Sequence, residues 1–244
     1  MNRQPLAPLP HPFRRLPERV DMEEILDDST TVDDGELKRS LRAMAQVNRR
    51  LGGNRSLVRH VLQVARSRHL RSLSLLDLGT GSGDTPRALR HRLERRGLRV
   101  RWVGLDRNER VAHLGARPGE SLVVGDALQL PFPDDAFDVV TSTLFLHHFT
   151  DRTMKLVLKE AARVARHGVV MSDLERHPLH YLGARCLGAT LWRSDPVTRY
   201  DGPVSVLRSC TPSELGQVAG TLPFQSLHVH RHLPFRIVLV GVLP

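Results

Sequence analysis

The sequence predicts an α/β fold in which a parallel β-sheet is covered by helices on both faces. From Leu73 onward, short apolar runs of strand-like composition alternate with longer segments whose apolar residues have helical spacing. The chain has 244 residues, 40% of them hydrophobic, which suits one domain with a full core and an N-terminal extension. No apolar run reaches the ~18 residues that a membrane-spanning helix needs.

The first part of the chain is expected to lie outside the sheet. Residues 1–34 are proline-rich and acidic by turns, and we expect a flexible segment without the apolar core of a secretion signal. Residues 35–70 carry apolar side chains at three- and four-residue spacings, which predicts a helical cover. Gly52 and Gly53 divide this cover into two helices.

The remaining residues, 71–244, are expected to form the principal domain. Its first five strands are predicted at Leu73–Leu78, Val100–Leu105, Ser121–Val124, Phe137–Ser142 and Gly168–Ser172. The helices between them are predicted at Thr85–Arg96, Glu109–Leu114 and Thr150–Ala165. Asp84 is the expected N-cap of the first of these helices, with Pro86 in its first turn.

The alternation pauses after the fifth strand. A lid insertion is predicted at about 177–209, with an apolar helix at Leu182–Trp192 followed by a loop at Asp195–Pro203. Thr211-Pro212-Ser213-Glu214 then forms a capping box that starts another helix. The chain closes with two strands whose connection is too short for a parallel pair: Phe224–His230 and Phe235–Val242.

The segment from Leu75 to Asp84 is the most informative for function. A buried strand ends in an acid and then breaks into glycines at alternate positions, 79, 81 and 83. Glycines allow positive φ and close approach of a ligand to the backbone. The spacing departs from the G-x-G-x-x-G pattern of nicotinamide dinucleotide sites, and the lysine of a P-loop is absent. Asp77 and Asp84 would repel a pyrophosphate but attract an ammonium and a sulfonium, which favours S-adenosylmethionine over NAD.

Three acids follow successive strands of the predicted sheet. Asp77 lies at the end of the first strand, Asp106 follows the second and Asp126 the third, so all three meet at the carboxyl edge, where ligands bind. An acid after the second strand can accept hydrogen bonds from a ribose diol, and one after the third can meet the amine of adenine. Aspartate also favours loop starts and helix caps, which explains a single acid better than three in succession.

Four motifs carry a resemblance to a known family: Leu76–Gly83, Gly104-Leu105-Asp106, Gly125-Asp126-Ala127 and Leu130–Val140. Over about Leu73–Leu174 the chain resembles a class I S-adenosylmethionine-dependent methyltransferase, of the small-molecule branch that includes ubiquinone and menaquinone biosynthesis methyltransferases. The resemblance implies a Rossmann-like, doubly wound, seven-stranded sheet with a C-terminal antiparallel hairpin.

The same resemblance implies the cofactor site. The methionine moiety is expected against the glycine turn, the ribose on Asp106 and the adenine beside Asp126. The expected cofactor-binding residues are Asp77, Gly79, Thr80, Gly81, Gly83, Asp84, Asp106, Arg107, Asp126, Ala127 and Thr143.

The segment after the fourth strand supplies the candidate catalytic residues. His147 or His148 is positioned to act as a general base, although either side chain can instead cap or pack against the following helix. Full proton transfer from a phenol of pKa about 10 to a histidine of pKa about 6.5 is uphill by about 5 kcal/mol. Because the sulfonium is already an activated donor, positioning and desolvation can supply much of the rate.

The acceptor pocket is expected after the fifth strand. Asp173, Arg176, His177 and His180, with Tyr200 from the next loop, are the candidate substrate-binding residues, the alternative being a polar loop that leads into a lid helix. The apolar lid favours a hydrophobic aromatic, polyketide-like or quinone-like acceptor, methylated on oxygen first and on carbon second. Arg50 is a further candidate for the carboxylate of the cofactor.

Two other classes of function remain open. The formal charge of +10 suggests an RNA methyltransferase, although the arginines are dispersed, and a non-catalytic protein with a cofactor fold is the third possibility. The Asn/Asp-Pro-Pro-aromatic tetrapeptide of amine methylases is absent, and neither Cys186 nor Cys210 stands where a cytosine methylase needs its nucleophile. The cysteines lack metal-ligand spacing and are not expected to pair, so we expect no metal and a cytoplasmic location. A monomer and a homodimer fit the sequence equally.

Overall fold

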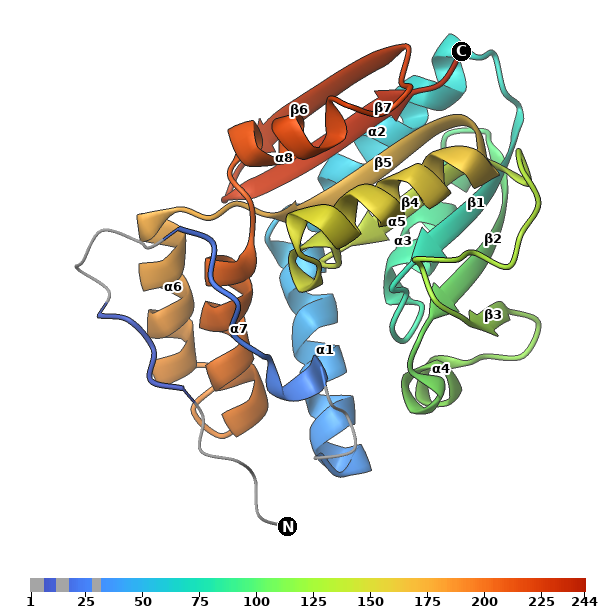
Figure 1. The fold of residues 1–244 in the computed structure, drawn as a ribbon. Coiled ribbons are helices and arrows are strands. Elements are labelled where there is room, and N and C mark those ends of the chain that lie inside the picture. Colours follow the sequence, from blue (N-terminus) through green and yellow to red (C-terminus); the bar gives the residue numbers. More distant parts are fainter. Residues whose placement is uncertain (1–6, 12–17, 28–31) are drawn as a thin grey trace.

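A single seven-stranded sheet organises the chain (Figure 1). The computed structural model describes residues 7–11, 18–27 and 32–244. The strands are β1 (Ser72–Leu78), β2 (Arg99–Asp106), β3 (Ser121–Val124), β4 (Phe137–Thr143), β5 (Ala165–Leu174), β6 (Ser226–His232) and β7 (Arg236–Val242). Their order is β3-β2-β1-β4-β5-β7-β6. The first five strands are parallel, and β7 runs antiparallel to both β5 and β6, which confirms the predicted seven-stranded sheet with a terminal hairpin.

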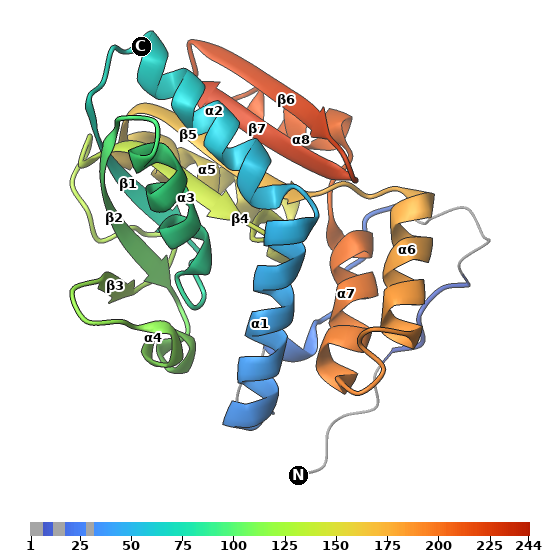
Figure 2. The ribbon, with the colours of Figure 1, turned by 180° about the vertical axis from the view of Figure 1, so that it is seen from behind.

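Helices cover both faces of this sheet (Figure 2). On one face lie α2 (Gly53–Ser67) and α3 (Asp84–Glu94), and on the other α5 (Asp151–Val164) and α8 (Pro212–Ala219). Successive strand residues serve opposite faces: Leu75 packs with α2 and α3, whereas Leu76 packs with α5. Strands buried on both faces give the continuous apolar runs from which the sequence predicts them.

A second group of helices stands at the carboxyl ends of the parallel strands. It consists of α1 (Asp34–Arg50), α6 (Pro178–Ala189) and α7 (Pro196–Arg208), which lie beside one another in both views (Figures 1 and 2). The predicted helical cover of residues 35–70 therefore has two parts, because α1 stands at this edge while α2 packs on the sheet. The two helices separate at Gly52, which has a φ of +82°.

The start of α3 differs from the prediction. Gly83, with a φ of +75°, is the N-cap, and Asp84 is the first helical residue. The Asp84 carboxylate accepts a hydrogen bond from Ser82 Oγ (2.7 Å) instead of capping the helix. The N-cap position requires a glycine because its backbone is in the left-handed region. Asp84 is therefore the residue after the N-cap.

The predicted loop at Asp195–Pro203 is wrong, because these residues belong to α7. Asp195 caps the helix by accepting from the backbone N–H of Thr198 (3.3 Å), and Pro196 occupies the first turn. Pro203 lies inside the helix, although a proline at this position of the sequence predicts that the helix ends. The helix continues through this proline because Val197 and Val204 are fully buried, so tertiary packing offsets the missing backbone hydrogen bond.

The N-terminal segment packs against this helical group. Part of the predicted flexible segment, residues 1–6, 12–17 and 28–31, lies outside the described residues. Within the described part, Glu24 and Ile25 are buried, and the backbone N–H of Ile25 donates to Asp201 Oδ1 (2.8 Å) in α7. Among the helices of the described ranges, none is long and apolar enough to cross a membrane. Cys186 and Cys210 are both free thiols.

Candidate active site

One cavity of about 960 Å³ opens between the carboxyl ends of the strands and the helical group α1, α6 and α7. This position is where the doubly wound sheet topology places ligands. Ten of the predicted cofactor residues line it: Asp77, Gly79, Thr80, Gly81, Asp84, Asp106, Arg107, Asp126, Ala127 and Thr143. Gly83 does not, because it forms the N-cap of α3 behind the turn.

The glycine turn is held open toward the cavity. Gly79 and Gly81 have φ values of +60° and +56°, which L side chains rarely adopt. A Cβ on Gly79 would also lie 2.2 Å from the ring of Phe145. The backbone N–H of Gly81 donates to Asp106 Oδ2 (2.8 Å), so the turn after β1 is tethered to the end of β2. These contacts leave backbone, not side chains, facing a ligand.

Polar groups beside the turn suit the amino-acid end of S-adenosylmethionine. Asp77 is 1% exposed and accepts from Thr141 Oγ1 (2.8 Å). Burial raises the pKa of its carboxyl to about 7. Thr143 Oγ1 is buried without a hydrogen-bond partner among the described residues. An ammonium group in the cavity would offset the burial of the carboxylate and supply a donor for the hydroxyl, so these residues fit the expected cofactor.

His147 lies in a 3₁₀ turn, Leu146–His148, that follows β4. Its Nδ1 is 2.8 Å from Asp173 Oδ1, and its backbone N–H donates to Asp173 Oδ2 (3.0 Å). Burial alone would raise the pKa of Asp173, but the charge and hydrogen bond of His147 outweigh it and hold that pKa at about 2. Asp173 therefore lies behind His147 as an ionised carboxylate and fixes the orientation of its ring.

His148 has a carboxylate partner of its own. Its Nδ1 is 2.8 Å from Asp27 Oδ1, and its ring centroid is 4.3 Å from that of His147. Burial would lower the pKa of His148, but the carboxylates of Glu24 and Asp27 raise it above the ordinary value. Arg208 forms an ion pair with Asp27 and donates to the carbonyl oxygens of His147 (3.3 Å) and His148 (3.1 Å). The turn is thus fixed from both the N-terminal segment and α7.

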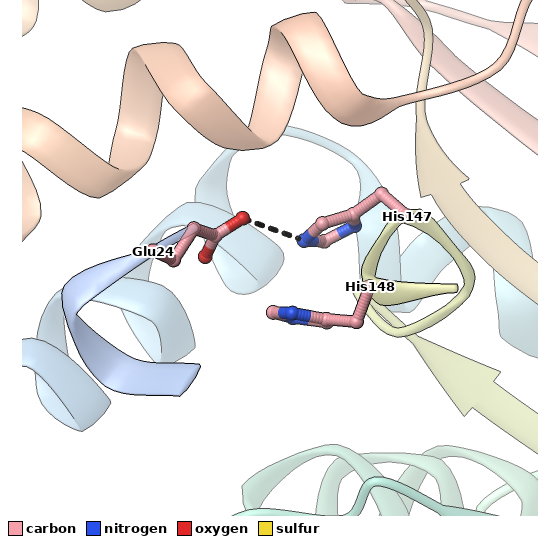
Figure 3. Close-up of side chains that lie close together, drawn as sticks. All are labelled: Glu24, His147 and His148. Atoms are coloured by element: carbon pink, nitrogen blue, oxygen red, sulfur yellow. Dashed lines mark ion pairs between the residues drawn. The ribbon is translucent and has the colours of Figure 1, made fainter. Parts of the chain in front are cut away.

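Glu24 completes this group of side chains (Figure 3). It is 7% exposed, and its Oε1 lies 3.5 Å from His147 Nε2 and accepts from Ser205 Oγ (2.9 Å). Sequence reasoning missed Glu24, Asp27 and Arg208. In the sequence, Glu24 and Asp27 belong only to a run of acids in a proline-rich segment. No spacing pattern relates them to the two histidines, which follow more than 100 positions later.

The residues predicted to bind the acceptor are largely placed elsewhere. His180 lines the cavity, where it stacks on Phe235 with ring centroids 5.2 Å apart. Arg176 forms an ion pair with Glu214, away from the cavity. Asp173 does not line the cavity either, because His147 covers it.

The other candidates also have structural roles. His177 caps α6 by accepting from the backbone N–H of Leu179 (3.2 Å), and the hydroxyl of Tyr200 donates to the carbonyl of Ala7 (3.4 Å). Neither lines the cavity, and Arg50 is exposed outside it. His177 is occupied as the N-cap of the lid helix, which begins at Pro178, and Tyr200 is held by its bond to Ala7, so the structure does not bring these side chains into the cavity.

Comparison with known proteins agrees with this geometry. The model of the family described as "Methyltransferase domain" matches residues 76–172. A demethylmenaquinone methyltransferase of Thermobifida fusca is 30% identical over 173 residues, which cover 63% of this chain and 70% of the relative. One of Roseiflexus castenholzii is 34% identical over 163 residues, which cover 59% and 64%. The structure of the plantazolicin methyltransferase BpumL in complex with monoazolic desmethylPZN analog and SAH aligns with a TM-score of 0.65 at 15% identity, covering 90% of this chain and 94% of that one.

The fold and the cavity define a Rossmann-like protein with a site for an adenosyl cofactor. The chain belongs to the class I S-adenosylmethionine-dependent methyltransferases and resembles the quinone methyltransferases among them. S-adenosylmethionine is the cofactor of this family. The matched regions span 38, 44 and 64% of the length of three demethylmenaquinone methyltransferases, so the chain matches less than two thirds of each of these relatives.

Proposed function

We propose that the protein transfers the methyl group of S-adenosylmethionine to the oxygen, or to a carbon, of a small hydrophobic acceptor of aromatic, polyketide-like or quinone-like type. The observation that carries this proposal is that the glycine turn and the two histidines line the same cavity. Its volume of about 960 Å³ is at the upper end of small-molecule sites, which suits a cofactor together with an acceptor.

The bound cofactor supplies a methyl group activated by a sulfonium. We propose that Asp77 and Thr143 hold its amino-acid end, that Asp106 holds the ribose and that Asp126 lies by the adenine. The apolar side chains that α6 and α7 contribute to the cavity, Leu179, Leu187 and Val206 among them, exclude water from the acceptor.

The acceptor is activated by His147 and His148. The bond from Asp173 fixes Nδ1 of His147 as the protonated nitrogen and leaves the lone pair of Nε2 available on the acceptor side of the cavity. A carbon acceptor of the phenolate type loses the same hydroxyl proton before its ring carbon is methylated.

A binding and turnover experiment tests this function. Calorimetry is expected to detect S-adenosylhomocysteine binding to the purified protein, and mass spectrometry is expected to detect methylated product from a panel of phenols, polyketides and quinols. Asp106→Ala removes charge-assisted hydrogen bonds worth about 1.5–3 kcal/mol, so its affinity for S-adenosylhomocysteine should fall by roughly 10- to 100-fold. Absence of binding by the unaltered protein would contradict the proposal.

An RNA methyltransferase is the second candidate, favoured by six arginines that gather on α2 and at the end of α3: Arg55, Arg59, Arg66, Arg92, Arg95 and Arg96. None of the six lines the cavity. Affinity for tRNA or rRNA fragments that persists at physiological salt would favour this candidate, whereas salt-labile binding without sequence preference would not.

A further inference from the structure

We infer that Glu24, His147 and His148 bind a divalent transition-metal cation that coordinates the hydroxyl of the acceptor. One ligand atom from each side chain lies within 4.8 Å of the other two, and Glu24 Oε1 is 3.5 Å from His147 Nε2. Ligands that each lie about 2.0–2.2 Å from a metal are separated by roughly 3–3.5 Å, so a small inward movement of rotatable side chains closes the site. Glu24 from the N-terminal segment faces His147, and the ring of His148 lies beside that of His147 (Figure 3).

The hydrogen bonds behind the ring nitrogens support coordination. Each histidine directs Nδ1 to a carboxylate at 2.8 Å, His147 to Asp173 and His148 to Asp27. In metalloproteins a ligating histidine is oriented in this way, since the carboxylate fixes the proton on one nitrogen and leaves the lone pair of the other for the metal. Both histidines here have that arrangement, and Nε2 is the nitrogen that remains on each.

The charges around the site also call for a cation. Glu24, Asp27 and Asp173 bring three carboxylates to the two rings, and Arg208, paired with Asp27 and 3.9 Å from Glu24, brings one guanidinium. The buried guanidinium of Arg236 also interacts electrostatically with Asp173, and the remaining surplus of negative charge favours a cation. A set of two histidines and one carboxylate with free coordination positions suits Zn²⁺, Mn²⁺, Fe²⁺ or Co²⁺ in preference to Ca²⁺ or Mg²⁺.

The inferred metal site rests on the proposed function. It extends that function because it indicates the chemical class of the acceptor. All three ligands line the cavity that also holds the glycine turn, so the free positions of the metal face the acceptor. An acceptor with two neighbouring oxygens, such as a catechol or an enolised β-dicarbonyl, would occupy two of those positions.

Metal coordination also removes the energetic obstacle to a histidine base. The bound hydroxyl loses its proton to water, the resulting oxyanion attacks the methyl carbon, the new O–C bond forms and the S–C bond breaks. The products are the methyl ether and S-adenosylhomocysteine. Because the cation stabilises the oxyanion, the uphill transfer from a phenol to imidazole is not required.

Metal binding is tested on the full-length protein after removal of metals by chelation. Titration with Zn²⁺, and with Co²⁺ followed by its visible absorption, is expected to show one bound equivalent. Glu24→Gln should weaken this binding by at least tenfold, and His148→Gln should do the same. S-adenosylhomocysteine binding, measured on every variant, is expected to persist and shows that each variant is folded.

A second histidine cluster, formed by buried His60 of α2 and half-buried His230 and His232 of β6, provides the matched control. His60 stacks on His230, with ring centroids 4.5 Å apart, and is able to attract metals without relation to the cavity. His230→Ala should therefore still bind one equivalent of metal at the cavity. Metal binding lost in His230→Ala but kept in Glu24→Gln would overturn the inference, as would an absence of metal binding in protein that binds S-adenosylhomocysteine. If the protein binds S-adenosylhomocysteine but no metal, His147 remains a candidate base that acts without a metal. If the protein does not bind S-adenosylhomocysteine at all, the proposed function is overturned instead.

Discussion

At the scale of single residues, the buried carboxyl of Asp77 couples the cofactor site to pH. Its ordinary pKa of 3.8 is raised to about 7 in the folded protein, chiefly because burial disfavours the charged form. Between these values the folded state binds more protons than the unfolded chain. The contribution of Asp77 to stability is therefore complete below about pH 4 and is lost as the pH rises to 7.

Asp77→Asn isolates this effect. Without ligand, the free energy of unfolding of the original protein minus that of the variant should fall by roughly 2–3 kcal/mol between pH 5 and pH 8. Urea unfolding at a series of pH values measures the difference. Asp126→Asn, at an exposed carboxyl, serves as the control and should not change the pH profile. A pH-independent difference for Asp77→Asn would show that the carboxyl is already ionised at pH 5.

The predicted cofactor residues that the structure brings to one cavity share one property. The glycines and acids after β1, β2 and β3 are adjacent to the strands that position them, so local pattern and sheet topology together predict that they line one cavity. Glu24 and Asp27 are fixed by side chains from β4–α5 and α7, and such long-range packing leaves no periodic pattern in the chain. Arg176 and His177 also follow a strand, but an ion pair with Glu214 and the N-cap of α6 hold them outside the cavity, and the sequence pattern does not indicate these roles.

At the scale of elements, α7 shows how packing overrides a local signal. The predicted strands agree with the structure to within a few residues. The central strands β1, β4, β5 and β7 are mostly buried on both faces, whereas the edge strands β3 and β6 are only partly buried. The helix at Pro196–Arg208 was missed because Pro203 indicates a break, while Asp195 and Pro196 provide an equally clear start. The burial of Val197 and Val204 decides between these signals, and burial depends on the rest of the fold.

The N-cap of α7 is open to a direct test. Asp195→Ala removes the acceptor for the Thr198 N–H and for Thr198 Oγ1, which lies 2.6 Å from Asp195 Oδ2, and is expected to cost about 1–2 kcal/mol of stability. Asp195→Asn retains a capping oxygen and should recover most of the loss. Thermal unfolding of the two variants measures this, and equal melting temperatures for Asp195→Ala and the original protein would contradict the assigned cap.

At the scale of the whole molecule, one buried contact ties the helical group to the sheet. Arg236 in β7 is 1% exposed, and its Nη2 donates to Asn48 Oδ1 in α1 (2.9 Å). Burial lowers the pKa of Arg236 to about 10, so the guanidinium remains charged at neutral pH. The position of α1 over the cavity therefore depends in part on a charge inside the protein.

Asn48→Ala should lower the free energy of unfolding by more than replacement of Arg236 itself. It leaves a buried guanidinium without this acceptor, for which we expect a loss of about 3 kcal/mol in the free energy of unfolding. Arg236→Met removes the charge together with its need for a partner and should cost less. Urea unfolding of both variants and of the double variant gives the comparison, and additive effects would show that the two side chains do not interact energetically.

The route of the chain through the active site also sets an order of assembly during synthesis. The glycine turn and the strand ends that face the cofactor have all left the ribosome once Thr143 has emerged. Asp27 is made much earlier, but its partner Arg208 follows 181 residues later. At about 5–20 residues per second, the acids at 24 and 27 wait roughly ten to forty seconds for α7. The glycine turn and the strand ends are therefore made first, and the side of the cavity that Glu24, Asp27 and Arg208 form closes only after α7 has been synthesised.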